Sequence, residues 1–200
     1  MEQYVITISR QFGSMGRSIA KELSENLGIE FLDRDIVEAT AKRMGLPVSV
    51  ISDEEESMKS TFFRRQYPLG MGMSSLKDEI FYTQKNIIRD FAAKGSCIIV
   101  GRCADYALAD EPHCLNIFIR SNMDDRIKRI SERLNVTENK AKDIIKKKDK
   151  ERSSYYNYYT SKKWGDARSY DLCLNTSQIS VEDSIELILK YRECMRSHNK

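Results

Sequence analysis

Short apolar runs alternate along the chain with longer segments in which apolar side chains recur every three or four residues. The short runs predict buried strands, and the longer segments predict amphipathic helices. Strands are expected over residues 4–9, 29–32, 97–100, 115–120 and about 170–174. Helices are expected over residues 16–27, about 34–44, 76–94, about 122–134, 137–158 and from about 181. Because strands and helices alternate, the pattern predicts an α/β fold with a parallel sheet and right-handed crossovers.

Helix starts are marked by short polar residues. Three segments have the spacing of a capping box, in which a Ser precedes an acidic residue by three positions. These segments are residues 75–78, 121–124 and 180–183. Asp33 is expected to cap the helix over 34–44.

Residues 47–75 show less regular patterning. A helix is expected to about residue 58, followed by a mobile loop, and the acidic run 53–56 is interpreted as a solvated helix face. The length of 200 residues suits one α/β domain over 1–200, or a core with a small inserted lid.

Composition narrows the class of protein. Hydrophobic residues make up 40% of the chain and charged residues 32%, which is typical of a globular domain with a charged surface. The net charge of +3 gives no reason to expect nucleic-acid binding, and no apolar run approaches the length of a membrane span.

The five cysteines are widely spaced and include no C-x-x-C pair, so a structural zinc site is not expected. Cys97, Cys114 and Cys173 lie in strand-like runs and are interpreted as small core residues. This cysteine usage predicts a reduced, cytoplasmic protein.

The junction between the first strand and the first helix carries the strongest chemical signal. A Gly-containing loop there leads directly into a helix, so backbone N–H groups and the positive end of the helix dipole meet at one point. The phosphate-loop pattern is G-x-x-x-x-G-K-[ST]. The chain matches its end as Gly16-Arg17-Ser18 but has Gln11 at its first position. A plain strand–turn–helix with a surface arginine is the alternative.

Polar side chains follow each expected strand. They are Ser9-Arg10-Gln11, Asp33-Arg34, Gly101-Arg102, Arg120 and Asn175-Thr176. Ligands of open parallel sheets bind beyond the carboxyl ends of the strands. The rim is rich in guanidinium groups and poor in carboxylates, which favours a site that handles phosphate charge.

A basic cluster over residues 146–152 could supply further cations from a lid helix. The alternative is a solvated helix face with ion pairs between successive turns. Tyrosines crowd the region after it, and we interpret them as packing residues, with base stacking as the alternative.

Five segments resemble the cytidylate-kinase-like family of phosphate-loop kinases. They are residues 6–16, 31–36, 98–106, 149–156 and 170–176. The resemblance runs nearly end to end and is weakest between about 50 and 75. It implies a three-layer P-loop kinase fold, with a five-stranded parallel sheet flanked by helices. It also implies an acceptor-binding variable insert at about 45–75 and a helical lid at about 137–168.

The resemblance implies transfer of the γ-phosphoryl group of ATP, with Mg²⁺, to a nucleoside monophosphate such as CMP or dCMP. The small nucleotide would be the only partner, and the protein would be a monomer or a homodimer. The implied ATP-binding residues are Gly13, Ser14, Met15, Gly16, Arg17 and Ser18, with Ser18 near Mg²⁺. The implied acceptor-binding residues are Asp33, Arg34, Arg102 and Asp105, and the implied catalytic residues are Arg17, Asp149 and Arg152.

Two positions depart from the family's pattern. Arg17 stands where cytidylate kinases carry Lys, and Cys103 stands where they carry an Asp that helps to recognise the acceptor. Asp105 lies two residues further on. Two alternatives to a cytidylate kinase therefore stay open: a nucleotide-binding regulatory module without turnover, and a kinase for another small metabolite.

Overall fold

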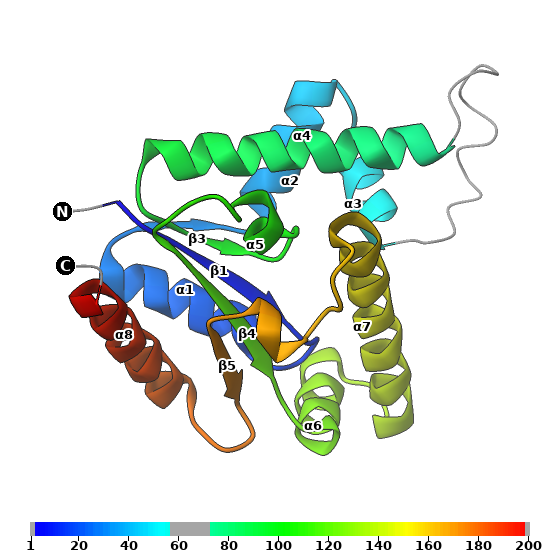
Figure 1. The fold of residues 1–200 in the computed structure, drawn as a ribbon. Coiled ribbons are helices and arrows are strands. Elements are labelled where there is room, and N and C mark those ends of the chain that lie inside the picture. The colour runs from blue at the N-terminus through cyan, green and yellow to red at the C-terminus, as the bar shows by residue number, and fades with distance from the viewer. Residues whose placement is uncertain (1–2, 57–72, 199–200) are drawn as a thin grey trace.

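The computed structural model describes residues 3–56 and 73–198 and contains one five-stranded parallel sheet (Figure 1). The strand order is β2-β3-β1-β4-β5, with β1 at the centre. The strands are β1 (Val5–Arg10), β2 (Glu30–Leu32), β3 (Cys97–Val100), β4 (Cys114–Arg120) and β5 (Leu172–Asn175). All four pairings are parallel, which confirms the prediction from the alternating pattern.

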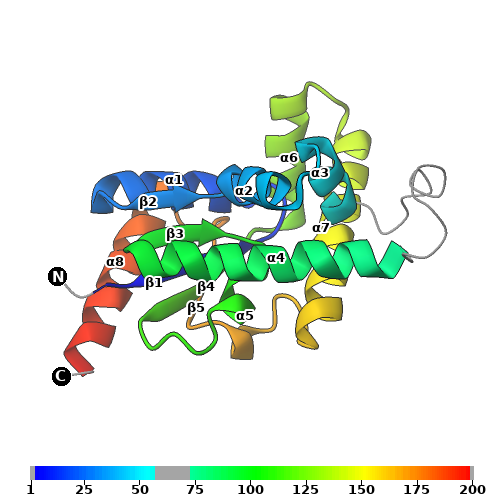
Figure 2. The same cartoon turned by 90° about the horizontal axis from the view of Figure 1, so that it is seen from above.

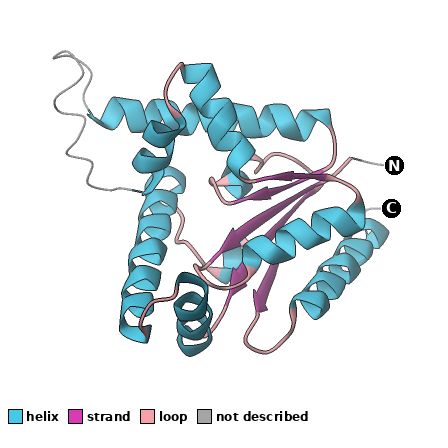
Figure 3. Cartoon of the chain, turned by 180° about the vertical axis from the view of Figure 1, so that it is seen from behind, coloured by secondary structure: helices cyan, strands magenta, loops and turns pink. Residues whose placement is uncertain are grey.

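Helices cover both faces of this sheet. The helices are α1 (Gly16–Leu27), α2 (Arg34–Met44), α3 (Val48–Glu56), α4 (Met73–Lys94), α5 (Ala104–Ala107), α6 (Met123–Leu134), α7 (Glu138–Thr160) and α8 (Val181–His198). Figure 2 shows α1 on one side of the sheet and α5 on the other, and Figure 3 shows α1 lying across the sheet with α8 beside it. The three-layer P-loop kinase architecture is thereby confirmed.

The period-two alternation of the central strands divides the core between the two faces. Ile6 and Ile8 of β1 pack in one cluster with Ile19 and Leu23 of α1 and with residues of α8. Val5 points to the other face, where a second cluster includes residues of α2, α4 and α5. Both strand faces are therefore apolar, which explains why these strands read as nearly continuous hydrophobic runs.

The parallel sheet places the functional ends of its strands together. Helices α6 and α7 stand beyond the carboxyl ends of β1 and β4 (Figure 1). The helix predicted over 137–158 is α7, and it begins at an N-cap formed by Thr137, whose side chain accepts a hydrogen bond from the backbone N–H of Lys140.

The capping predictions met different outcomes. Ser180 and Asp183 form the expected reciprocal box at the start of α8, with hydrogen bonds of 3.2 and 3.0 Å between backbone and side chains. The box at Ser121 was wrong, because α6 starts one residue later than a box would require and the Ser121 hydroxyl pairs with Ser177 instead. Helix α4 begins at Met73, ahead of the expected start at Ser75.

Asp33 precedes α2 as predicted, but its carboxylate makes no capping bond. The carboxylate is instead engaged by the side chain of Arg17, which the loop after β1 brings beside it. A charged partner close in space has therefore outcompeted the local backbone donors.

Two of the three cysteines expected in the core are buried, namely Cys97 and Cys114. Cys173 is exposed, because β5 is an edge strand. The loop expected after residue 58 lies outside the described residues.

Candidate functional site

The loop after β1 has a backbone shaped to hold an anion at the start of α1. Met15 stands at the N-cap with φ 64°, and no side chain caps the helix. Gly16 faces the side chain of Arg10 so closely that a Cβ there would lie 2.7 Å from Arg10 Cβ. Ser14 fastens the loop to the sheet, because its hydroxyl donates to the carbonyl oxygens of Gln11 and Ile119 at 2.9 and 3.1 Å. An uncapped helix N-terminus on a fixed loop suits phosphate.

A cavity of about 540 Å³ opens over this loop, and we call it the donor cavity. All six residues expected to bind ATP line it: Gly13, Ser14, Met15, Gly16, Arg17 and Ser18. Arginines from three other elements also line it, namely Arg10, Arg129, Arg133 and Arg152, together with one carboxylate, that of Glu132. The cavity therefore gathers several guanidinium groups around a helix N-terminus, which favours a polyphosphate ligand.

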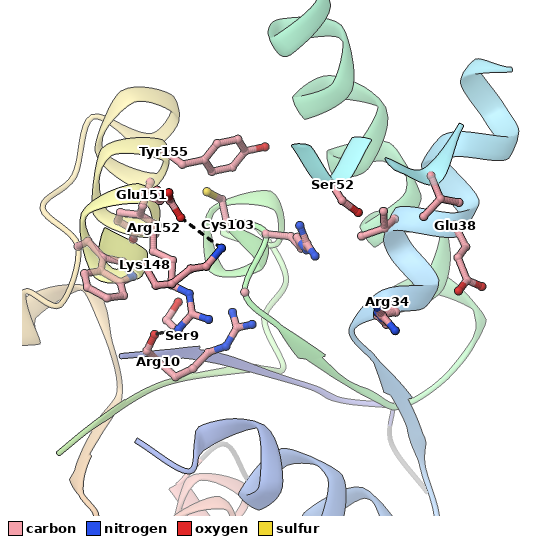
Figure 4. A pocket seen from close by; sticks show the side chains of 16 residues that line it. Ser9, Arg10, Arg34, Glu38, Ser52, Cys103, Lys148, Glu151, Arg152 and Tyr155 are labelled. Atoms are coloured by element: carbon pink, nitrogen blue, oxygen red, sulfur yellow. Dashed lines mark hydrogen bonds and ion pairs between the residues drawn. The ribbon is translucent and has the colours of Figure 1, made fainter. Parts of the chain in front are cut away.

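A second cavity, of about 490 Å³, lies on the other side of Arg10, and we call it the acceptor cavity (Figure 4). Arg34 and Arg102, both expected to bind the acceptor, line it together with Cys103. Figure 4 shows Arg34, Glu38 and Ser52 on one side of the space and Glu151, Arg152 and Tyr155 on the other. Lysine and arginine side chains outnumber carboxylates along this wall, so the cavity suits an anionic small molecule.

Arg10 and Arg152 line both cavities. Arg152 Nη1 donates to the backbone carbonyl oxygen of Arg10 at 3.1 Å, which joins α7 to the end of β1. Burial, followed by the positive charge of Arg152, lowers the pKa of Arg10 to about 9, so its guanidinium stays charged at neutral pH. Two cations held this close together favour an anion between the cavities.

The turn that carries Arg102 has an unusual backbone. Gly101, Arg102 and Cys103 have φ values of 74°, 60° and 52°, so three successive residues occupy the left-handed region. A Cβ at Gly101 would lie 2.0 Å from Arg10 Nη1. Left-handed conformations of non-glycine residues are costly and tend to persist where a site requires them. This turn brings Arg102 and Cys103 to the acceptor cavity.

Asp105 lies behind that wall. It is buried, accepts a hydrogen bond from the hydroxyl of Tyr156 at 2.6 Å, and is absent from the described residues that line the two cavities. Burial raises the pKa of Asp105 above its ordinary value. The structure therefore brings the thiol of Cys103 to the cavity and leaves the carboxylate of Asp105 behind it. Burial also raises the pKa of Cys103, which keeps the thiol protonated.

Asp149 connects α7 to the phosphate loop. Its carboxylate accepts a hydrogen bond from the backbone N–H of Phe12 at 2.7 Å and pairs with Arg126 of α6. The Asp149 side chain is not among the described cavity-lining groups. In this structure Asp149 holds α7 against the loop, and of these two predicted catalytic residues on α7 it is Arg152 that reaches the cavities.

The basic cluster of α7 is divided by helical periodicity. Lys148 and Arg152, four residues apart, face the acceptor cavity, whereas Lys146, Lys147 and Lys150 are exposed. Part of the cluster is therefore a solvated helix face, and the part that lines the cavity keeps the prediction of a cation-supplying lid open. Lys148 also pairs with Glu151 at 3.4 Å, so a carboxylate partly neutralises the positive charge of this wall.

The tyrosines after the basic cluster mostly pack against the core. The ring of Tyr159 stacks on Phe81 of α4 with centroids 4.1 Å apart, and Tyr155 and Tyr156 belong to the same hydrophobic cluster. The expected packing role is confirmed for these three. Tyr155 and Tyr156 also line the acceptor cavity beside Trp164.

Sequence reasoning did not single out the arginines of α6 as site residues. Arg129 donates to the carbonyl oxygens of Gly13 and Thr176 at 3.3 and 2.9 Å, and so ties the phosphate loop to the end of β5. Arg133 lies over the ring of Phe12, with its guanidinium carbon 5.2 Å from the ring centroid. The spacing of Arg126, Arg129 and Arg133 places them on one face of a helix, which is the signal that could have found them.

The donor set near the loop fits a magnesium ion that arrives with a nucleotide. Ser18 lies in the first turn of α1, is exposed and lines the donor cavity, so its hydroxyl oxygen is available as a hard ligand. Among the described residues, no group of three or more His, Cys, Asp or Glu side chains is arranged to hold a metal. Mg²⁺ commonly binds through one or two protein groups plus substrate phosphates, and a single exposed hydroxyl beside the phosphate loop fits that mode of binding.

Comparison with known proteins decides the family. The model of the cytidylate kinase-like family matches residues 5–178, which is most of the chain. The chain belongs to the cytidylate kinase-like family. A cytidylate kinase from Sulfolobus acidocaldarius is 27% identical over 186 residues, which span 92% of this chain and 91% of that protein.

Solved structures agree with this fold. An uncharacterized protein from Eubacterium ventriosum is 32% identical, with a TM-score of 0.74 over 96% of this chain and 99% of its own. A gluconokinase from Sinorhizobium meliloti is 12% identical with a TM-score of 0.61, over 98% of this chain and 95% of its own. This more distant similarity shows the fold alone. In the described part of this cytidylate kinase-like chain, no helix is both long and apolar enough to span a membrane.

Proposed function

We propose that this protein is an ATP-dependent phosphotransferase that moves the γ-phosphoryl group of ATP to a nucleoside monophosphate, with CMP or dCMP as the first candidates. The observation that carries the proposal is the pair of cavities that share Arg10 and Arg152. One cavity lies over a phosphate loop and the other presents Arg34 and Arg102. Direct transfer needs donor and acceptor in line, with cations where charge develops between them.

Each element of the site has a role in this reaction. The phosphate loop and Arg17 would bind the triphosphate of ATP, and the hydroxyl of Ser18 would hold Mg²⁺, which neutralises phosphate charge when bound. Arg152 and Arg10 would stabilise the phosphoryl group in transit. Asp149 would keep the lid helix in register with the loop through the Phe12 N–H.

On the acceptor side, Arg102 and Arg34 would bind the phosphate of the monophosphate, since one guanidinium group can form two parallel hydrogen bonds to phosphate oxygens. Asp33 would act through the arginines beside it, because its carboxylate pairs with Arg17 and lies 4.0 Å from Arg10. Asp105 would support this wall from behind through Tyr156.

A second candidate is a kinase for another small anionic metabolite. Cys103 favours it, because a protonated thiol on the cavity wall is a poor acceptor for the exocyclic amine of cytosine. The remaining carboxylates along the cavity, Glu38 and Glu151, come from α2 and α7.

A coupled ADP-release assay tests the proposal. The protein is incubated with ATP and Mg²⁺ against CMP, dCMP, UMP, AMP and GMP, with an ATP-only control. Strong stimulation of ADP release by CMP or dCMP is expected. ATP binding without stimulation by a nucleoside monophosphate would direct the search to other phosphorylated or hydroxylated acceptors, and failure with those would leave a nucleotide-binding module without turnover.

A further inference from the structure

The phosphate loop carries arginine where lysine is usual, and the surroundings of Arg17 are built for that exchange. Arg17 Nε donates to Asp33 Oδ2 at 2.6 Å. The guanidinium carbon of Arg17 also lies 5.5 Å from the ring centroid of Phe31. Two contacts of different kinds, from two residues at the end of β2, therefore hold one guanidinium group that lines the donor cavity.

The Asp33 carboxylate is well protected, whereas Arg17 is open. The Asp33 side chain is 10% exposed and that of Arg17 is 58% exposed. Asp33 Oδ1 faces Arg10, whose Nη2 lies 4.0 Å away. A buried carboxylate between two arginines is costly to leave without a partner, so Asp33 will retain a strong cation at its Oδ2 side.

Arginine and lysine differ in how they can pair with Asp33. A guanidinium group donates sideways through Nε–H and still has two terminal nitrogens with four further N–H groups. Lysine presents its three N–H donors from a single nitrogen, so it binds Asp33 and a phosphate oxygen together only where both lie within hydrogen-bonding distance of that one atom. Arginine donates from separate nitrogens, so Nε can stay with Asp33 while the terminal nitrogens reach phosphate oxygens further away.

We propose that Asp33 is a positioning residue that orients Arg17 through Nε, and that the pair makes the phosphate loop depend on arginine. Binding of the ATP triphosphate would engage the terminal nitrogens of Arg17 while the Nε–Asp33 bond persists. The inference rests on the proposed function only in taking the donor cavity as the site of ATP phosphates, and it makes no claim about the acceptor.

Binding of Mg-ATP, measured by calorimetry, tests the pair without requiring turnover. R17K is expected to weaken binding by on the order of 10-fold or more, because the single nitrogen stays with Asp33. In R17K/D33N the competing carboxylate is gone, and most of that loss is expected to be recovered. The surface pair Arg43–Asp90, at 2.8 Å, supplies matched controls, since R43K and D90N change the same chemistry away from both cavities.

A second test is made on the wild-type protein by NMR, and it uses variants only to assign and compare a resonance, so they need not bind nucleotide. The Arg17 Nε–H resonance, assigned by its loss in R17K, is expected to be sharp, shifted downfield and slow to exchange, both without ligand and with Mg-ATP bound. D33N is expected to return it to the position of a solvated arginine. An Arg17 resonance that exchanges rapidly in the wild-type protein overturns the proposal. Wild-type affinity in R17K, or a double variant as weak as R17K, also overturns it.

Failure of the inference and failure of the proposed function give different results. If the wild-type protein binds Mg-ATP but transfers no phosphoryl group, the acceptor assignment fails and the coupling between positions 17 and 33 is still measured. If the wild-type protein binds no nucleotide, the donor assignment fails and the inference is overturned with it.

Discussion

Arg152 on α7 donates from Nη1 to the backbone carbonyl oxygen of Arg10 at the end of β1, at a distance of 3.1 Å. This bond places an arginine of α7 at the boundary between the donor and acceptor cavities, both of which it lines. The two residues are 142 positions apart in the chain, and the parallel sheet brings them together. Phosphoryl transfer between the two cavities would depend on this boundary.

Replacement of Arg152 with Ala tests its role at the boundary. We expect kcat to fall by about 10²–10³-fold with a smaller change in the KM for ATP, because the cation acts where charge develops in the transition state. Steady-state kinetics on the best acceptor measures both constants. Lys150→Ala is the matched control, since Lys150 is exposed on the same helix. An Arg152→Ala enzyme with wild-type kcat would contradict the assignment.

Replacement of Arg102 with Ala tests the acceptor cavity. We expect the KM for the acceptor to rise by on the order of 10-fold or more, since hydrogen bonds between charged groups are worth about 1.5–3 kcal/mol. The affinity for ATP should stay close to wild type, because Arg102 is not among the described residues that line the donor cavity. Arg120→Ala is a fair control, because Arg120 is exposed and is not among the described residues that line either cavity. Equal losses of ATP and acceptor binding would argue against separate cavities.

Gly16 tests the fit between the phosphate loop and Arg10. A methyl group at position 16 would meet Arg10 Cβ at 2.7 Å, so we expect Gly16→Ala to lower the free energy of unfolding by about 1–3 kcal/mol and to weaken ATP binding. Gly95→Ala is the control, because nothing lies within 4 Å of a Cβ at position 95. Denaturant unfolding of the two variants measures the difference. Equal free energies of unfolding for the two variants would contradict the expected close packing of the loop against Arg10.

Asp105 gives stability a dependence on pH with a definite sign. Because burial raises its pKa in the folded state, Asp105 binds its proton more tightly in the folded than in the unfolded chain. The stabilisation of the folded state that comes from protonated Asp105 is therefore fully present below the ordinary Asp pKa. It is lost as the pH rises through the pKa that Asp105 has in the folded state. We expect Asp105→Asn to remove this decline, so the variant should gain stability relative to wild type as the pH increases from about 4. Melting temperatures across that range measure the gain, and a difference that does not change with pH would contradict it.

The strands and the phosphate loop could be predicted because their signals are local. Each of these signals is contained within about ten residues: the apolar runs of β1 and β3, and the Gly-containing loop after β1. The family model and the strand order then confirmed the fold. The reciprocal box at Ser180 is a local signal of the same kind, and it held.

The outcomes that sequence reasoning missed depend on contacts between distant residues. Asp33 has the position of an N-cap, yet its partner is Arg17, which lies 16 residues earlier and reaches it only through the fold. Cys173 has an apolar neighbourhood in sequence, but its exposure follows from the edge position of β5. Asp105 is near Arg102 in sequence, and only the turn of left-handed residues decides that Cys103 reaches the cavity.

Direct identification of the phosphorylated product tests the central claim most sharply. The protein, ATP and Mg²⁺ are incubated with CMP or, in a parallel sample, with dCMP, and phosphorus NMR follows ATP, ADP and the acceptor, with samples lacking the acceptor or lacking protein as controls. We expect ADP and the nucleoside diphosphate, CDP or dCDP, to appear in equal amounts, only when all components are present. A protein that binds ATP but forms no phosphorylated product with CMP or dCMP would contradict the cytidylate kinase assignment. If no anionic acceptor from a wider panel gains a phosphoryl group, the phosphotransferase claim itself is contradicted.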